Sequence, residues 1–224
     1  MIIGIHGIKR SGKDTVAQYL MKKNPGLVQI AFADAIKESL SAAFNTDNTL
    51  PELTGLKICL DDFYEGGRYD RDNHDLGISN AAAHLWLKTA LAVLKVNYPD
   101  IPTNVPDNLK IAPRKVWTIR ILMQILGTDI VTKYHPDYWV KITIRDIETI
   151  LENGHNGVIV SDVRFANEAQ ALRDIHAKMI FLERDTGNRD HHLSEQGLTP
   201  TNRDVLIINN GTLEDLYKKV DRIL

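Results

Sequence analysis

Short apolar runs alternate with longer stretches of helical periodicity along the chain. The first run, IIGIH at residues 2–6, ends at a glycine and has the length and composition of a buried strand. Similar runs occupy residues 27–33, 156–162, 178–184 and 205–210. The pattern predicts helices at residues 13–23, 35–44, 78–96, 113–127, 137–154, 165–177 and 212–224. Strands that alternate with helices predict an α/β fold, in which a five-stranded parallel sheet carries helices on both faces.

Local signals mark the ends of several predicted helices. An Asn-Pro-Gly sequence at 24–26 ends the first helix, and Asp34 is placed to cap the second. Pro113 suits a first helical turn, and Gly127 predicts that the same helix stops there. Thr212 is the expected cap of the last helix, because acidic residues that complement the helix dipole follow it.

Residues 45–78 differ from the rest of the chain, since they hold few apolar residues, many aspartates and several glycines. We expect a mobile or ligand-ordered segment there. A largely helical block, 45–155, falls between the second and third predicted strands. The chain of 224 residues is therefore interpreted as one domain with an insertion.

Composition narrows the class of protein. The chain has 27 Lys and Arg residues and 29 Asp and Glu residues. The formal net charge of −2 therefore does not indicate a basic nucleic-acid-binding surface. The single cysteine, Cys59, excludes a disulfide within the chain and fits a reducing compartment. No apolar run approaches the length of a membrane span. We expect a soluble cytoplasmic protein without nucleic-acid or membrane partners.

The stretch GIKRSGKDT at residues 7–15 directly follows the first predicted strand. Gly7, Gly12 and Lys13 fit the pattern G-x-x-x-x-G-K, in which glycines let backbone N–H groups surround phosphate oxygens. The helix that begins near Lys13 points its positive end at the anion, and the lysine brings charge to the transferring phosphates. Because the motif lies between a strand and a helix, it predicts a nucleotide or phosphate site, with a structural turn as the alternative.

Two acidic positions are candidates for holding Mg²⁺. Asp14 stands where many such loops place a hydroxyl that binds the metal. It either holds the metal through water, with the Thr15 hydroxyl one residue later, or only complements the helix N-terminus. Asp162 lies at the end of strand 156–162, beyond which ligands of doubly wound sheets bind. We predict that Asp162 holds the metal and that Arg164 clamps a phosphate, with a helix N-cap as the alternative for Asp162.

Six motifs follow one another along the chain: GIKRSGKDT, RILMQILGTD (120–129), YWVK (138–141), VSDVR (160–164), HLSE (192–195) and VLIINNGTLEDL (205–216). Together they resemble the bacteriophage deoxynucleoside monophosphate kinases, from the first strand to the last helix and most weakly across 46–112. The resemblance implies a P-loop kinase fold that transfers the γ-phosphate of ATP to a deoxynucleoside monophosphate with Mg²⁺. In that fold, 46–112 is a variable acceptor-binding insertion and 185–204 is a lid. A homodimer in the cytoplasm of a phage host is also consistent with the resemblance.

The resemblance assigns roles to individual positions. The residues that match the ATP site are Lys9, Arg10, Gly12, Lys13, Asp14, Thr15 and Asn209. The residues that match the acceptor site are Ile36, Lys37, Tyr69, Asp70, Arg71, Arg120, Gly127, Thr128, Trp139, Asp162 and Arg164. The residues expected to act in catalysis are Lys13, Arg120, Asp162, Arg164 and Arg184. The metal candidates are Asp14, Thr15 and Asp162.

Several of these roles have a structural alternative. Trp139 either stacks on the acceptor base or packs in the core of an amphipathic helix. Arg120 either contacts a phosphate or lies on a solvated helix face, and Lys37 is either a ligand contact or a surface lysine. Asn209 either contacts the adenine edge or belongs to a turn before the last helix.

The predicted lid carries further arginines. Arg184 and Arg189 either neutralise charge when the lid closes or are exposed loop arginines. His191 and His192 are adjacent and have no third ligand at metal-binding spacing, so a metal site there is disfavoured.

Other functions remain compatible with the residues alone. Kinases for dephospho-coenzyme A or phosphomevalonate share loops of this kind, and the latter also shows a similar strand-end sequence. A nucleotide-dependent switch is an alternative of a different class, although a guanine-reading N-K-x-D motif is absent. Aromatic and arginine residues in 60–71 favour an acceptor that contains a base. The expected partners are small-molecule nucleotides.

Overall fold

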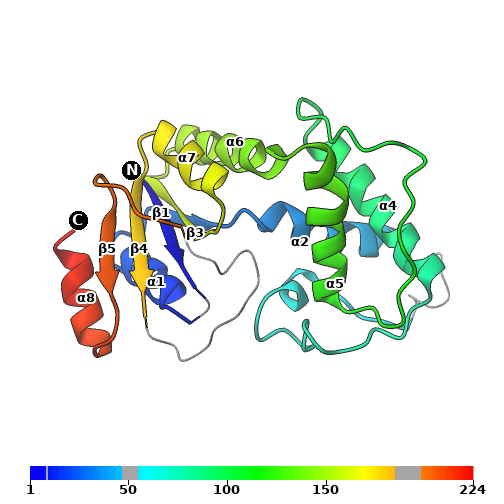
Figure 1. Cartoon of the computed structure of the whole chain (residues 1–224), viewed down its shortest axis with the longest axis horizontal. Helices are drawn as coiled ribbons and strands as arrows, with labels where there is room; N and C mark the ends of the chain where they lie inside the picture. Colours follow the sequence, from blue (N-terminus) through cyan, green and yellow to red (C-terminus); the bar gives the residue numbers. More distant parts are fainter. Residues whose placement is uncertain (9, 47–54, 185–197, 224) are drawn as a thin grey trace. The chain divides into compact units, whose positions relative to one another are not determined.

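The computed structural model describes every residue except 9, 47–54, 185–197 and 224. Its sheet consists of β1 (Ile2–Gly7), β2 (Leu27–Ile30), β3 (Gly157–Val163), β4 (Lys178–Glu183) and β5 (Val205–Ile208). Neighbouring strands in the order β2-β3-β1-β4-β5 all run parallel, with β1 at the centre (Figure 1). This confirms the predicted five-stranded parallel sheet. The central position of β1 explains why its sequence is mostly apolar.

Helices cover both faces of this sheet. α1 (Lys13–Lys23) and α8 (Leu213–Asp221) pack on one face, where they share a buried cluster with Ile5 of β1. Gly4, the preceding residue, points to the other face, where a Cβ would lie 3.0 Å from a leucine side chain of α7 (Ala166–Asp174). Because side chains alternate along a strand, β1 contributes to the core on both sides.

The chain divides into two compact units. The sheet unit comprises residues 1–32 and 143–224, and the insert unit comprises residues 33–142. The insert unit enters the chain between β2 and β3, where the sequence predicts a helical block. The second boundary falls inside α6 (Tyr138–Glu152). Within the described part of the chain, no helix combines the length and the apolar character needed to cross a membrane.

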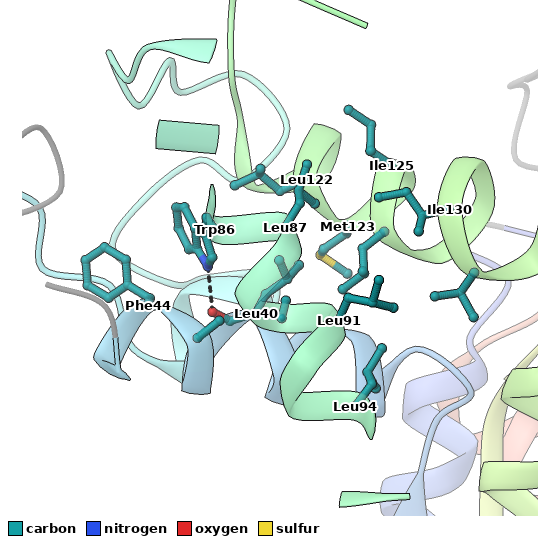
Figure 2. Close-up of a cluster of buried hydrophobic side chains, with 14 of the residues drawn as sticks. Leu40, Phe44, Trp86, Leu87, Leu91, Leu94, Leu122, Met123, Ile125 and Ile130 are labelled. Atoms are coloured by element: carbon teal, nitrogen blue, oxygen red, sulfur yellow. Dashed lines mark hydrogen bonds between the residues drawn. The ribbon is translucent and has the colours of Figure 1, made fainter. Parts of the chain in front are cut away.

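The insert unit has a hydrophobic core of its own. Its elements are α2 (Asp34–Thr46), η1 (Leu60–Phe63), α4 (Asn80–Asn97), α5 (Ile119–Gln124) and the π-helix η2 (Ile125–Thr132). Figure 2 shows leucines of α4 lying between side chains of α2 and those of α5 and η2. The indole Nε1 of Trp86 donates to the carbonyl oxygen of Leu40 at 2.8 Å, which satisfies the one polar atom of a ring that is only 1% exposed.

The predicted helix 113–127 is shifted in the structure. It begins at Ile119, because the Oγ1 of Thr118 caps it by accepting from the backbone N of Ile121 at 3.1 Å. It does not stop at Gly127 but continues in π-helical geometry to Thr132. The carbonyl oxygen of Gly127 accepts from the Oγ1 of Thr132 at 2.7 Å, so tertiary and side-chain partners replace the expected helix end.

Other element boundaries differ by a few residues. β2 ends at Ile30 rather than at residue 33, since the backbone N of Phe32 bonds to a side chain of β3. β5 ends at Ile208 rather than at residue 210. α7 ends at Asp174 rather than at residue 177, and His176 beyond it has a left-handed φ of 61°.

Most of the described residues 55–78 lack regular structure, but the segment is not loosely attached. Ile58, Phe63 and Leu76 are buried in the core of the insert unit. Burial alone would raise the pKa of the fully buried Asp62, but hydrogen bonds from Arg68 and from backbone N–H groups lower it to about 2. The segment is therefore fixed by side-chain contacts rather than by a helix or sheet ladder.

Candidate active site

The phosphate-loop sequence connects β1 to α1. Gly12 has a φ of 105°, in the left-handed region that favours glycine, and it immediately precedes Lys13 at the start of α1. A Cβ at Gly7 would lie 2.8 Å from the carbonyl oxygen of Leu182 on β4, so a larger residue would displace the strand. Because the first N–H groups of a helix have no partner within it, this turn presents donors to an anion.

Lys13 reaches back across the loop that precedes it. Its Nζ donates to the carbonyl oxygen of Gly7 at 2.6 Å and to that of Ile8 at 2.9 Å. The ammonium group is therefore held over the turn, at the end of the strand from which the loop starts.

Asn209, the residue after β5, supports this loop from the interior. It is only 6% exposed, and its Nδ2 donates to the carbonyl oxygen of Ser11 at 2.8 Å. A Cβ at Gly12 would lie 2.8 Å from the same Nδ2, so the glycine also allows this close approach. The structure thus gives Asn209 a role in holding the loop, and its contact with adenine stays a prediction.

β3 carries a bulge just before its end, beside the phosphate loop. Three steps along β3 match two along β1 up to the last register pair, which joins His6 to Val163. A bulge changes the direction of the side chains around it. Asp162 lies within this bulge, and its Oδ1 accepts from the backbone N of Phe32 at 2.7 Å. The predicted strand-end carboxylate is therefore anchored next to the strand that leads into the loop.

His6 holds the backbone on both sides of its ring. Its Nδ1 lies 2.8 Å from the carbonyl oxygen of Val163, which can only accept, so Nδ1 carries the proton. The backbone N of Leu198 donates to Nε2 at 3.1 Å, so the ring is in the neutral form with Nε2 unprotonated. Val163 lies between Asp162 and Arg164, and His6 thus fixes the peptide between the two predicted site residues.

Glu168 caps the N-terminus of α7. The N-cap residue is Phe165, which has no side-chain acceptor, and this excludes the alternative that Asp162 is the helix cap. The Oε2 of Glu168 accepts from the backbone N of Arg164 at 2.7 Å and from that of Phe165 at 2.9 Å. Burial and the nearby charge of Asp162 raise the pKa of Glu168 to about 7, although the two hydrogen bonds act in the opposite direction.

A cavity of about 360 Å³ opens beside the start of the phosphate loop. It lies at the carboxyl ends of β1, β4 and β5, the edge at which doubly wound sheets bind ligands. Apolar side chains form much of its wall, and Arg184 and Asn210 add polar groups. Its lining residues are His6, Gly7, Ile8, Phe181, Leu182, Glu183, Arg184, Leu198, Ile208 and Asn210. Its volume lies at the lower end of the range typical of small-molecule sites.

Within the insert unit, the predicted acceptor residues form two groups. In the first, a Cβ at Gly127 would lie 2.8 Å from the Cδ1 of Ile36, so these two residues of η2 and α2 are in contact. Trp139 is 8% exposed, and its Nε1 donates to the carbonyl oxygen of Gly127 at 3.1 Å. Trp139 therefore packs in the core, which was one of the two alternatives given for it. Its stacking on the acceptor base stays a prediction. Thr128 is exposed beside this group.

The second group consists of the segment 69–71 and the start of α5. The backbone N of Arg120 donates to the carbonyl oxygen of Arg71 at 2.9 Å, which brings two predicted arginines together. The Arg71 guanidinium donates to the carbonyl oxygen of Phe63 at 2.9 Å and pairs with a neighbouring glutamate. Asp70 accepts from backbone N–H groups of its own turn, and Tyr69 packs against the core of the insert unit. Asp70 thus has a structural role in addition to the predicted one.

Lys37 is buried, so it is not a surface lysine. Its Nζ lies 2.9 Å from the Oδ1 of Asp34 and 3.9 Å from the centre of the Tyr64 ring. The hydroxyl of Tyr64 donates to the same Oδ1 at 3.0 Å, and burial, followed by the charge of Asp34, raises the pKa of Tyr64. This cluster places one cation and one carboxylate near the start of α2.

The candidate metal ligands suit an ion that is bound together with the nucleotide phosphates, rather than one held entirely by protein side chains. Among the described residues there is no group of three His, Cys, Asp or Glu side chains that could hold a metal ion. Asp14 is exposed and Thr15 is half-buried on the first turn of α1, while Asp162 lies at the end of β3. Mg²⁺ typically takes only one or two protein ligands and completes its shell with phosphate oxygens and water. The residues present fit that mode.

The sequence matches known proteins over its full length. The family model described as deoxynucleotide monophosphate kinase matches residues 1–220. The deoxynucleotide monophosphate kinase of Escherichia phage RB69 is 31% identical over 246 residues, which cover 100% of this chain and 99% of that protein. The chain belongs to the deoxynucleotide monophosphate kinase family. The enzyme of Enterobacteria phage T4, with the same name, is 30% identical and is covered to 98% of its length. The resemblance stated from the motifs is therefore confirmed.

Some predicted positions of this deoxynucleotide monophosphate kinase family member lie outside the described residues. They are Lys9 of the ATP loop, Arg189, His191 and His192, and the lid as far as residue 197. Arg10 is described, with an exposed side chain and a φ of 66°, as is Arg184, which lines the cavity. Their roles stay predictions.

Sequence reasoning missed three residues that shape the site of this kinase. His6 looks like one more residue of a buried strand, and Leu198 looks like part of a polar connection. Glu168 stands three residues after Phe165. Phe165 occupies the N-cap position, so no Ser, Thr, Asp or Asn marks the start of this helix. A glutamate followed by an apolar helical pattern was the only local signal for the cap, and it was weak without its N-cap partner.

Replacing Glu168 by glutamine should make the stability of the kinase less dependent on pH. The folded-state pKa of about 7 exceeds the ordinary glutamate pKa of 4.5, so the wild-type protein loses stability as pH rises through this window. Glutamine does not ionise, and the variant should therefore gain up to about 3 kcal/mol relative to wild type between pH 4.5 and 8. Urea unfolding at several pH values measures this difference.

Asp215 provides the matched control. It accepts from the backbone N of Thr212 at the start of α8, but its pKa is lowered by hydrogen bonds from Thr212, so its replacement should not produce a gain with rising pH. If the free energies of unfolding of wild type and Glu168→Gln changed equally with pH, ionisation of the Glu168 carboxyl would not destabilise the folded protein.

Proposed function

We propose that the protein transfers the γ-phosphate of ATP to a deoxynucleoside monophosphate and releases the deoxynucleoside diphosphate and ADP. The observation that carries phosphoryl transfer is the glycine-lysine loop between β1 and α1, with Gly12 in the left-handed region and Lys13 held across the turn. The choice of acceptor is supported by the names of full-length relatives. A kinase acting on small nucleotides follows from the family itself.

The donor nucleotide is proposed to bind on the sheet unit. Backbone N–H groups at the start of α1 would hold its phosphates, and Lys13 would exchange its two carbonyl partners for phosphate oxygens. The cavity of about 360 Å³ begins at Gly7 and Ile8, the first residues of the loop. Its apolar wall would accept the base of ATP, and Asn210 and Arg184 would contact polar groups at its edge.

The acceptor phosphate is proposed to bind to arginines. Arg164 follows the strand that pairs with β1, so it leaves the sheet beside the phosphate loop. The motif resemblance also assigns Arg71 and Arg120 to the acceptor, and within the insert unit a backbone hydrogen bond joins these two residues. Guanidinium groups form paired hydrogen bonds with phosphate oxygens, which orients the acceptor for in-line attack.

Charge neutralisation is the main task of these residues. Phosphoryl transfer passes through a loose transition state, so positioning and electrostatics dominate over proton transfer. Mg²⁺ bound to the phosphates would supply a further positive charge, and Thr15 and Asp162 are the residues proposed to hold it, with Asp14 assisting through water. Lys13 would stabilise the charge that develops between the donor and the transferred group.

An acceptor panel tests the proposal directly. Purified protein with ATP and Mg²⁺ should phosphorylate at least one deoxynucleoside monophosphate, with one ADP formed for each deoxynucleoside diphosphate. Ribonucleoside monophosphates, phosphomevalonate and dephospho-coenzyme A are measured alongside, and product analysis by chromatography separates transfer from hydrolysis. We expect transfer to deoxynucleotides to exceed that to the two non-nucleotide acceptors by at least ~100-fold, because a site built for a base leaves polar groups unpaired with other ligands.

Two results would contradict this function. Transfer only to phosphomevalonate or dephospho-coenzyme A would assign the protein to another kinase class. ATP hydrolysis that no acceptor stimulates would instead favour a nucleotide-dependent switch.

A further inference from the structure

Four consecutive residues at the end of β3, 162–165, are fixed by hydrogen bonds of three side chains, those of Asp162, His6 and Glu168. The Asp162 carboxylate accepts from Phe32, as described above, and the His6 ring donates to the Val163 carbonyl. Glu168 then accepts from the backbone N of the next two residues. The peptide that carries the predicted metal ligand and phosphate clamp is therefore held by side-chain hydrogen bonds at each residue, in addition to the sheet pairing at Val163.

Glu168 is the unusual member of this set. An N-cap serine or aspartate at residue 165 would satisfy the start of α7 at the surface, without burying a carboxylate. Here the capping group comes from inside the helix, is 7% exposed and lies near the like charge of Asp162. The bond to the backbone N of Phe165 is that of a capping-box glutamate, but the second bond, to Arg164, lies outside the helix, so helix capping alone does not account for it.

The two bonds of Glu168 converge on one oxygen. Its Oε2 accepts from Arg164 at 2.7 Å and from Phe165 at 2.9 Å, which fixes the orientation of both peptide planes. The first of these belongs to the arginine itself, so the bond sets the direction in which the Arg164 side chain leaves the backbone. The carbonyl oxygen of the preceding residue, Val163, accepts from the Nδ1 of His6 at 2.8 Å.

We propose that Glu168 is a positioning residue for phosphoryl transfer, because its buried carboxylate orients the peptide that carries Arg164 and keeps it next to Asp162. The proposal rests on the proposed function of this site. Glu168 contacts no substrate in this scheme. It acts through the backbone of Arg164, so its effect requires an acceptor oxygen and not a negative charge.

Three variants separate these requirements. Glu168→Gln keeps an oxygen that accepts hydrogen bonds, and Glu168→Met has similar length without one. Asp215→Leu is the control, because it removes an equivalent bond to the backbone N of Thr212 at the start of α8. The kcat and the KM values for ATP and for the best deoxynucleotide acceptor are measured together with the melting temperature of each protein.

We expect Glu168→Met to lower kcat by roughly 30-fold and to raise KM for the acceptor, since a small displacement of a phosphate-binding group slows transfer strongly. KM for ATP should stay within about twofold, because the phosphate loop keeps all of its contacts. Glu168→Gln should retain kcat within about threefold of wild type, and Asp215→Leu should leave it unchanged. If Glu168→Met does not fold, Glu168→Asp, which is one methylene too short to reach both N–H groups, should show the same loss.

The proposal is overturned if Glu168→Met keeps the wild-type kcat, or if the glutamine and methionine variants lose activity equally. A fall in melting temperature with unchanged kcat and KM would show that Glu168 acts only as a helix cap. These results differ from a failure of the proposed function, in which the wild-type protein itself transfers no phosphate to any deoxynucleotide.

Discussion

Replacing Lys13 by alanine is expected to lower ATP-dependent phosphoryl transfer by roughly three orders of magnitude, because the ammonium group neutralises charge that develops during transfer. The loop should keep its shape in the variant. The steric contacts that require Gly7 and Gly12 do not involve Lys13. The Nδ2 of Asn209 donates to the carbonyl oxygen of Ser11 and also holds the loop without Lys13. Turnover with saturating ATP and acceptor measures the loss, and thermal unfolding measures the integrity of the fold.

Lys22 is the matched control for this experiment. It lies on the same helix, in its last turn, and its side chain is exposed. Lys22→Ala removes the same charge from α1 but should leave kcat within about twofold, since surface substitutions away from a site have small effects. Near-normal turnover of Lys13→Ala would remove the loop lysine from the mechanism, whatever the control shows.

The second large effect is expected at Asp162. Asparagine in its place keeps an oxygen for the backbone N of Phe32 but loses the charge that would hold Mg²⁺. We predict that kcat falls by about 100-fold or more and that a higher Mg²⁺ concentration is needed for half-maximal rate. Because the hydrogen bond at 2.7 Å is retained, the melting temperature should change little.

Asp14→Asn distinguishes the two candidate metal positions. Asp14 is exposed on the first turn of α1, where a carboxylate also stabilises the helix dipole. If Asp14 has only that electrostatic role, its variant should lose a few tenths of a kcal/mol of stability and little activity. A large shift in Mg²⁺ dependence for Asp14→Asn, with none for Asp162→Asn, would assign the metal to the loop instead.

The contacts around the phosphate loop show how the sheet unit organises chemistry at one edge. β1 lies between β3 and β4, so its end places the loop beside both the Asp162 segment and the cavity wall. His6, one residue before the loop, bonds to β3 on one side and to Leu198 on the other. A single central strand therefore links the predicted metal ligand, the phosphate-binding turn and the return from the lid sequence.

Local sequence was sufficient for much of this arrangement. Apolar runs predicted all five strands, because burial on both faces removes polar residues from parallel strands. The glycine-lysine loop was predictable because Gly7, Gly12 and Lys13 fall at fixed spacing within seven residues, directly between a predicted strand and a predicted helix. The place of Asp162 at a strand end followed from the same pattern, and the ordered motifs predicted the family that the comparison with known proteins confirmed.

Longer-range contacts explain the errors. Gly127 predicted a helix end, yet its carbonyl accepts from Trp139, twelve residues away, and the helix continues as a π-helix. Residues 113–118 were expected to be helical, but Trp117 is buried against the insert core and the helix starts after it. Helical propensity and glycine signals are local, and a buried partner from another element outweighs them.

The sequence by itself determined the succession of strands and helices along the chain, the phosphate loop and the family. These depend on periodicity and on residues close together in the chain. Only the tertiary structure decided the bulge that anchors Asp162, the Glu168 cap of Arg164 and the neutral form of His6. Each of these depends on a hydrogen bond or register that forms when separate segments meet. A side chain acquires such a role from the backbone groups that folding brings to it, and those groups cannot be identified from its neighbours in sequence.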